Sequence, residues 1–366
     1  MKPKILMVAN DTTFIYKLRK EILEAFIESG YEVYIVAKKI KFLNELIEIG
    51  CKFTELKVPR NDTNPLSDIN LLKKIYKIVK EIGPDMVFSN SIKPNVYFGI
   101  VCRRLGIPFI PNITGLGRAL EYPGILQKIS IVLYRFGLKS AHTVFFQNEF
   151  NRDFFIENKI IKKNQKYFIL PGSGVNINEH RVLPYPESNI LNFLFIARIR
   201  KEKGIDYFIN SSKKIHEKYP NTSFSVCGLC EDDSYLNIFH ELEKEGYFKY
   251  YGEQEDLTSF YQRANCIVHP TYYPEGMSNV LLEACAHGRP IITTDRPGCR
   301  EIIDHGYNGY MIDTKNQKQL DLAIEKFINL RLQDKINMGI KGREKIKDYF
   351  NREIIVDEYL KLIKNK

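Results

Sequence analysis

Two glutamates, Glu275 and Glu283, stand eight positions apart across a Pro-Glu-Gly turn that leads into an apolar segment. If a helix begins near Ser278, Glu283 lies on its second turn and Glu275 precedes it in the loop, so both carboxylates can face one ligand. The N–H groups of Gly276, Met277 and Ser278 would lie at the start of this helix, where anions bind. This arrangement suits a ligand that joins phosphate to a polyhydroxylated ring, as a nucleotide sugar does.

A second pair of charged residues, the basic Arg198 and Lys203, follows the apolar run 191–197. A forked guanidinium and a mobile ammonium can grip neighbouring phosphoryl oxygens and neutralise a leaving diphosphate without a metal ion. The two common phosphate loops are absent, since the sequence has no G-x-x-x-x-G-K-[ST] and its first apolar run is not followed by G-x-G-x-x-G. Taken separately, each charged pair is more often a solvated surface feature.

The elements that must position these residues form two successive series of short apolar runs separated by amphipathic helical segments. Strands are expected at 5–9, 33–37, 51–56, 86–88, 108–112, 143–146, 191–197, 222–227, 248–251, 266–269, 290–294 and 309–312. The order predicts an α/β protein of two Rossmann-like, doubly wound domains, residues 1–172 and 173–349, that face each other across a cleft. A C-terminal helix at about 350–366 is expected to pack back on the first domain.

The combination of Arg198 and Lys203 with Glu275 and Glu283 resembles the bacterial glycosyltransferases of family 4, which have the GT-B fold and retain anomeric configuration. The resemblance spans the whole chain and includes the segments 172–176, 283–292 and 306–309. It implies that Arg198 and Lys203 hold the donor diphosphate, that Glu283 accepts hydrogen bonds from the ribose hydroxyls, and that Glu275 contacts the transferred sugar. Residues 276–278 would lie near sugar or phosphate. Arg198, Lys203 and Glu275 are the expected catalytic residues, with no metal and no cofactor.

The acceptor side departs from the family pattern. Many members carry Gly-Gly or Gly-His after the first strand, where this chain has Asn10 and Asp11, and close relatives often have a histidine near the position of Asn90. Asn90 cannot act as a base, and the resemblance implies that the departing diphosphate oxygen can take the acceptor's proton. The remaining candidates for acceptor contacts are Lys93, which precedes Pro94, and four residues of the loop 112–118. These four are Thr114, Gly115, Gly117 and Arg118.

The pattern of residues 93–95 followed by 112–117 resembles members that extend polyprenyl-diphosphate-linked saccharides for capsule, lipopolysaccharide or protein glycosylation. We therefore expect a UDP-sugar donor carrying a hexose or N-acetylhexosamine and a lipid-linked saccharide acceptor. Two alternatives stay open: an isomerase of the same architecture, a UDP-N-acetylglucosamine 2-epimerase, and a catalytically silent subunit that binds a sugar nucleotide.

Charge is distributed unevenly along the 366 residues. Residues 1–172 hold 27 Lys and Arg against 16 Asp and Glu, whereas residues 173–366 hold 27 against 28. Such asymmetry indicates an anionic partner for the first half, either acidic lipid headgroups or a phosphorylated substrate, since the sequence has no nucleic-acid-binding motif; a solvated basic surface without a partner also stays open. With the membrane-embedded acceptor that the resemblance implies, the stretch 125–139, with Lys128, Arg135 and Lys139, would rest on acidic headgroups, although it also fits an ordinary core-facing helix.

No apolar run approaches the length of a membrane span, and the N-terminus lacks the apolar stretch of a signal peptide. We therefore expect a cytoplasmic protein, peripheral on the inner face of the membrane. Seven scattered cysteines suggest reduced thiols. Cys227, Cys230, Cys266 and His269 have spacings that could hold zinc, but the favoured interpretation is that 224–227 and 266–269 are buried strands, where cysteine behaves as a small apolar residue.

Overall fold

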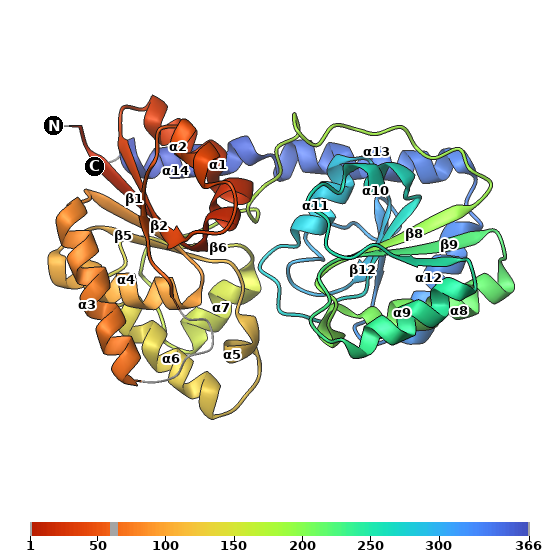
Figure 1. Cartoon of the computed structure of the whole chain (residues 1–366), viewed down its shortest axis with the longest axis horizontal. Coiled ribbons are helices and arrows are strands. Elements are labelled where there is room, and N and C mark those ends of the chain that lie inside the picture. Colours follow the sequence, from red (N-terminus) through yellow and green to blue (C-terminus); the bar gives the residue numbers. More distant parts are fainter. Residues whose placement is uncertain (1, 59–64, 365–366) are drawn as a thin grey trace. The chain divides into compact units, whose positions relative to one another are not determined.

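A computed structural model describes residues 2–58 and 65–364 of the chain. Its contacts divide the chain into two compact units, one formed by Met1–Ser173 with Arg352–Lys366 and the other by Gly174–Asn351. Figure 1 shows the chain coloured from the N-terminus to the C-terminus.

The first unit contains a seven-stranded parallel sheet in the order β3-β2-β1-β4-β5-β6-β7. Its strands are β1 (Lys4–Asp11), β2 (Glu32–Lys38), β3 (Lys52–Glu55), β4 (Met86–Asn90), β5 (Phe109–Ile113), β6 (Val144–Phe146) and β7 (Tyr167–Ile169). Its helices are α1 (Thr12–Glu28), α2 (Leu43–Glu48), α3 (Pro65–Ile82), α4 (Ile92–Leu105), α5 (Gly117–Glu121), α6 (Ile125–Leu138), α7 (Glu149–Glu157) and α14 (Arg352–Lys364).

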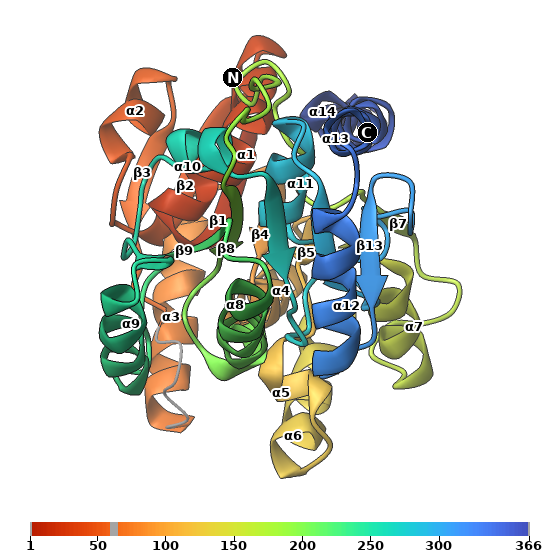
Figure 2. The same ribbon diagram turned by 90° about the vertical axis from the view of Figure 1, so that its right-hand side faces the viewer.

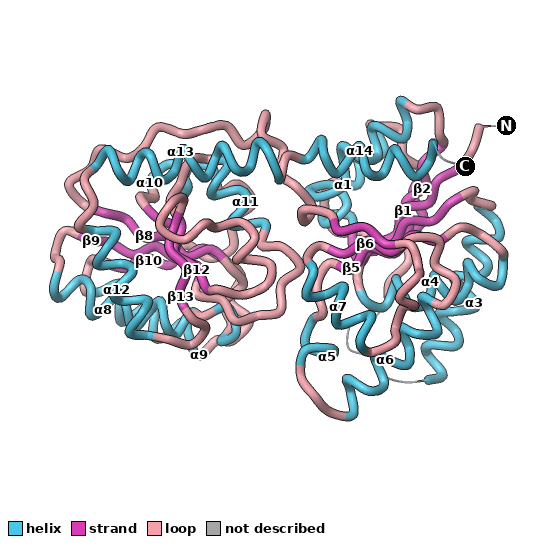
Figure 3. Tube along the Cα trace, turned by 180° about the vertical axis from the view of Figure 1, so that it is seen from behind, coloured by secondary structure: helices cyan, strands magenta, loops and turns pink. Residues whose placement is uncertain are grey.

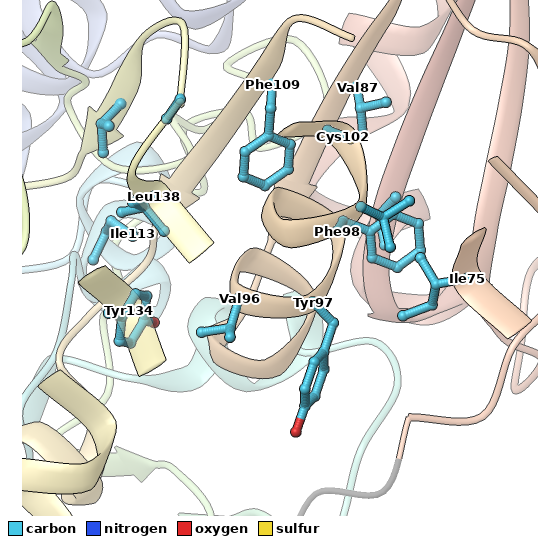
Figure 4. Close-up of a cluster of buried hydrophobic side chains, with 14 of the residues drawn as sticks. Ile75, Val87, Val96, Tyr97, Phe98, Cys102, Phe109, Ile113, Tyr134 and Leu138 are labelled. Atoms are coloured by element: carbon cyan, nitrogen blue, oxygen red, sulfur yellow. The ribbon is translucent and has the colours of Figure 1, made fainter. Parts of the chain in front are cut away.

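Alternation along β1 explains why helices cover both faces of this sheet. Ile5 and Met7 pack with α1 and α14 on one face, whereas Leu6 and Val8 pack with α3, α4 and α6 on the other. Figure 4 shows the second of these cores, where side chains of α4 fill the space between the sheet and its neighbouring helices. The C-terminal helix α14 contacts α1, and the Tyr31 hydroxyl donates to the Ile363 carbonyl at 3.2 Å.

The second unit contains a six-stranded parallel sheet in the order β10-β9-β8-β11-β12-β13. Its strands are β8 (Leu191–Ile196), β9 (Thr222–Cys227), β10 (Phe248–Tyr250), β11 (Cys266–His269), β12 (Ile291–Thr294) and β13 (Gly309–Ile312). Its helices are the 3₁₀ turn η1 (Lys201–Lys203), α8 (Ile205–Lys218), α9 (Ser234–Lys244), α10 (Thr258–Arg263), α11 (Asn279–Ala286), α12 (Gln317–Ile328) and α13 (Leu332–Tyr349). Helices α8, α9 and α12 cover one face, and α10, α11 and α13 cover the other (Figure 3).

The predicted architecture of two doubly wound parallel sheets is confirmed. In each sheet the first strand is an interior strand: β1 lies between β2 and β4, and β8 lies between β9 and β11. The strands that follow it in sequence are added first on one side of it and later on the other, so the strand order reverses there. Open α/β sheets bind ligands at such switch points, beyond the carboxyl ends of the strands. Ligands are therefore expected to bind beyond the carboxyl ends of β8 and β1.

Two local expectations need correction, and a third is confirmed. Strand β7, only three residues long, was not expected, and residues 112–118 are not all loop, because α5 begins at Gly117. The favoured interpretation of the zinc-like spacing is confirmed, since Cys227, Cys266 and His269 lie buried at strand positions. Within the part of the chain that the structure describes, no cluster of three or more metal-ligating side chains occurs.

Candidate active site

The charged residues singled out in the second half of the sequence lie at the carboxyl ends of neighbouring strands. Arg198 follows β8, whereas Glu275 lies in the loop after β11, which pairs with β8. Parallel strands bring such loops to the same edge of the sheet. The two motifs, far apart in sequence, therefore meet at the switch point of the second unit.

Lys203 forms an ion pair with Glu275. Its Nζ also lies 4.4 Å from the centroid of the Tyr273 ring, and the residue is only 8% exposed. The lysine thus carries its charge inside the protein, held between a carboxylate and an aromatic face.

A glycine makes this close approach possible. Gly204 follows the η1 turn with φ at +82°, and a Cβ there would lie 2.1 Å from the carbonyl oxygen of Pro270. Only glycine accommodates both the left-handed conformation and the contact. The turn that carries Lys203 is thereby packed directly against the loop that carries Glu275.

Arg198 is half exposed, and its guanidinium donates to a Glu231 carboxylate oxygen at 3.0 Å. Arg200 lies 3.2 Å from the other oxygen of the same carboxylate. Neither Arg200 nor Glu231 was among the residues expected at the site. Both could have been predicted from their sequence positions. Arg200 stands two positions beyond Arg198, and Glu231 follows β9, the other neighbour of β8.

Helix α11 begins immediately after Ser278, as the spacing predicts, so Glu283 lies on its second turn. The carboxylate of Glu283 accepts a hydrogen bond of 3.1 Å from the Tyr261 hydroxyl. Burial, and then the nearby Glu283 charge, raise the pKa of Tyr261 well above its usual range, so this tyrosine stays a donor. Tyr261 therefore orients a half-buried carboxylate, a positioning role that the sequence did not reveal.

The loop before α11 offers fewer free donors than expected. The N–H of Ser278 donates to the Gly298 carbonyl at 2.8 Å, and the Met277 side chain packs in the core. Gly298 itself, with φ at +88°, approaches so closely that a Cβ there would lie 2.8 Å from the Glu275 Cβ. The segment 275–278, including the buried Gly276, is therefore held by the loop after β12.

Two buried polar atoms beside this loop have no hydrogen-bond partner among the described residues: Nδ1 of His269 and Oδ1 of Asn279. Burial, and secondly the charge of Lys203, lower the pKa of His269 to about 3, so the imidazole is neutral. Asn279 is the first residue of α11. Its unpartnered amide oxygen adds a polar group to the site that the sequence analysis missed.

The acceptor-side candidates lie in the first unit, at the ends of three adjacent strands. Asn10 is half-buried within β1, and Asp11 caps α1 by accepting from the Phe14 N–H at 2.8 Å. Lys93 lies in the first turn of α4, after β4. The cap role of Asp11 gives that residue a structural function in addition to any ligand contact.

Asn90 ends β4 and is fully buried. Its side-chain oxygen Oδ1 accepts from Nε and Nη2 of the buried Arg19 at 3.1 and 3.0 Å, and its side-chain nitrogen Nδ2 donates to the Val8 carbonyl at 3.3 Å. The side chain is engaged inside the unit, because it fixes Arg19. The expected acceptor contact of Asn90 is therefore not supported, because its side chain is fully buried within this unit.

The loop after β5 lies beside the start of α4, since a Cβ at Gly117 would approach the Ile92 side chain to 3.0 Å. Thr114 and Gly115 are half-buried, and Gly115 and Gly117 both have positive φ. The backbone of Arg118 belongs to α5, and its side chain lies outside what the structure describes. Thr114, Gly115 and Lys93 are thus brought to one edge of the first sheet.

Comparisons with known proteins agree with this layout. The family described as glycosyl transferases group 1 matches residues 179–345, and the family described as glycosyl transferase 4-like matches residues 4–148. A Campylobacter jejuni enzyme named N,N'-diacetylbacillosaminyl-diphospho-undecaprenol alpha-1,3-N-acetylgalactosaminyltransferase is 27% identical over 368 residues, covering 95% of each chain. The capsular polysaccharide biosynthesis glycosyltransferase CapM of Staphylococcus aureus is 25% identical, covering 92% of this chain and 90% of its own.

Solved structures show the same fold. A glycosyltransferase from Rickettsia africae superposes with a TM-score of 0.81 at 18% identity, covering 100% of this chain and 98% of its own. Anabaena HepE, solved in complex with UDP and glucose, has a TM-score of 0.81 at 16% identity and covers both chains completely, 100% of each. The chain is therefore a glycosyltransferase of the GT-B fold, with a glycosyl transferase 4-like domain followed by a domain of glycosyl transferases group 1.

Proposed function

We propose that this glycosyltransferase moves a hexose or N-acetylhexosamine (GalNAc, GlcNAc, Gal or Glc) from a UDP-sugar to a saccharide carried on a polyprenyl diphosphate, with retention at the anomeric carbon. The observation that carries the donor half is the direct contact between Lys203 and Glu275. In a nucleotide sugar the diphosphate and the sugar share one oxygen atom, so a cation for the first and a carboxylate for the second must be neighbours.

The donor assignment extends to the surrounding groups. Arg198 and Lys203 would hold the diphosphate and neutralise the charge that develops as it departs, which makes a metal ion unnecessary. Glu275 would bind sugar hydroxyls. Glu283, oriented by Tyr261, would accept from the ribose diol, since one carboxylate can serve two vicinal hydroxyls.

The uridine nucleotide is supported by HepE, which was solved with UDP and glucose and with UDP-glucose. The lipid-linked acceptor is supported by the Campylobacter jejuni relative, whose name specifies an undecaprenol diphosphate substrate. An acceptor of this kind is embedded in a membrane, so we place the enzyme at the cytoplasmic face of that membrane. No helix in the described residues is long and apolar enough to cross a bilayer.

The test incubates the full chain with a panel of UDP-sugars, with and without polyprenyl-diphosphate-linked saccharides, and follows UDP release and product by mass spectrometry and NMR. We expect acceptor-dependent UDP release, a product with the same anomeric configuration as the donor sugar, and no loss of turnover in EDTA. Epimerised UDP-sugar without acceptor would instead establish the isomerase. An inverted product would refute retention, and inactivation by EDTA would refute the metal-free mechanism.

A further inference from the structure

Helix α6 is apolar on two opposite sides. Its inner side packs Ile131, Tyr134 and Leu138 into the core of the first unit. The helix lies close against α4 because of a pair of glycines, since a Cβ at Gly99 would lie 2.2 Å from the carbonyl oxygen of Gly137. This contact fixes the orientation of α6 and decides which side chains face outward.

The outer side of α6 carries a continuous apolar stripe in place of the polar residues usual on a surface helix. Six large side chains spaced by one turn or less each keep between 41% and 80% of their area exposed. They are Ile125, Leu126, Ile129, Val132, Leu133 and Phe136. In Figures 1 and 2, α6 lies with α5 at the lower edge of its unit, so this stripe is directed away from the sheet.

Positive charge surrounds the stripe. Residues 86–148, which include α4, α5 and α6, hold seven Lys and Arg and a single acidic residue, Glu121. Lys128, Arg135 and Lys139 lie on α6 or directly after it and are exposed, and Arg103 of α4 donates to the Phe136 carbonyl at 2.9 Å. The apolar stripe is therefore flanked by three exposed basic residues on or directly after its own helix, within a sequence segment of net positive charge.

We propose that α6 lies in the surface of a lipid bilayer that contains acidic headgroups, with its apolar stripe among the acyl chains and its basic residues at the phosphates. This inference rests on the proposed function in one respect, because the lipid-linked acceptor gives the enzyme a membrane to work on. A helix of 14 residues is about 21 Å long, shorter than the hydrocarbon core of about 30 Å, so it lies in the interface and does not span it.

The same observations argue against a second copy of the chain as the occupant. In a two-fold symmetric contact the stripe would meet its own image, which would bring Lys128, Arg135 and Lys139 of both copies together. Like charges at such an interface oppose association. An acidic bilayer offers both an apolar interior and the opposite charge.

The test is flotation of the full-length protein with phosphatidylcholine vesicles, alone and in a two-to-one mixture with phosphatidylglycerol. We expect binding to the acidic vesicles, reduced roughly tenfold or more in Ile129→Glu and in Phe136→Glu, because each puts a charge in place of an apolar side chain that would lie among the acyl chains. Lys128→Ala should weaken binding to acidic vesicles about fivefold and leave binding to neutral vesicles unchanged. Leu322→Glu on α12 is the matched control, since Leu322 is 54% exposed and Phe136 is 56% exposed, and it should bind as the wild type does.

Equal vesicle binding by the wild type, Ile129→Glu and Phe136→Glu would overturn the proposal. So would a wild-type dimer in light scattering that these two substitutions convert to monomer without any vesicle binding. UDP affinity, measured by calorimetry without lipid, should be unchanged in both variants and confirms that they are folded. Because flotation uses neither donor nor acceptor, a failure of this proposal is separate from a failure of the proposed transfer reaction.

Discussion

Replacing Lys203 by Met removes one ammonium group and retains most of the side-chain volume beside Tyr273. The proposed role of this lysine is to stabilise the charge on the departing diphosphate. Removing one preorganised group of this kind costs about 2.7–4 kcal/mol of transition-state stabilisation in enzymes, so we expect kcat/KM to fall by about 10²–10³. The measurement is UDP release at saturating and limiting UDP-sugar.

The substitution also has a structural cost, because it leaves the Glu275 carboxylate, whose side chain is 17% exposed, without its cation. Loss of one partner from a largely buried polar group costs about 1–3 kcal/mol, and loss from a charged group costs more. We expect a lower midpoint of thermal unfolding, and we expect the double variant Lys203→Met with Glu275→Gln to recover most of that midpoint. Turnover should not recover, because the diphosphate still lacks its ammonium.

Lys201 provides the matched control, because it lies in the same η1 turn and is exposed. Lys201→Met should keep kcat/KM within about twofold of the wild type, as is usual for an exposed residue without a ligand contact. If Lys203→Met were as active as Lys201→Met, the lysine would not act on the diphosphate. If the double variant regained turnover, the loss would be due to the stranded carboxylate alone.

Three further predictions concern the frame of the donor site. Tyr261→Phe should weaken UDP binding about tenfold in calorimetry, because Glu283 loses a charge-assisted hydrogen bond; unchanged affinity would contradict the ribose role. Gly204→Ala should cost roughly 3 kcal/mol or more of unfolding free energy, since its Cβ would strike a backbone oxygen, whereas Gly246→Ala, also at positive φ but in open space, should cost about 1 kcal/mol. Burial lowers the pKa of His269 from 6.5 to about 3. Between these pH values the imidazole is protonated in the unfolded chain but neutral in the folded protein, so the free energy of unfolding falls as pH falls, by roughly 3 kcal/mol at pH 4. Urea denaturation of His269→Gln should show a shallower acid dependence, and an equal slope would refute the assignment.

The fold and the frame of the donor site were predictable because both depend on local pattern. Buried parallel strands show as short apolar runs, and a right-handed crossover between them limits the topology to few choices. Once β8 and β11 are neighbours, the residues that follow them must meet, so the proximity of Lys203 to Glu275 follows from their sequence positions.

The side-chain partners were not predictable, because they depend on packing between distant elements. Nothing in the sequence indicates that Tyr261 reaches Glu283, or that the Ser278 N–H donates to a carbonyl after β12. For the segment 125–139 the sequence left two interpretations open, a stretch resting on acidic headgroups and a core-facing helix, for a related reason. A helix with two apolar sides has an ambiguous pattern until the structure shows which side packs against α4.

The buried state of Asn90 bears on how the transferred sugar is delivered. An amide that is spent in fixing Arg19 neither binds an acceptor hydroxyl nor removes its proton. The proton then requires another acceptor, and in the proposed reaction the nearest developing negative charge is on the diphosphate oxygen that leaves the sugar. Arg198 and Lys203 would stabilise the diphosphate while this oxygen takes the proton on the same face of the ring. In the proposed reaction, retention of configuration and the use of cationic side chains for the diphosphate would both follow from one arrangement, in which the leaving group serves as the base.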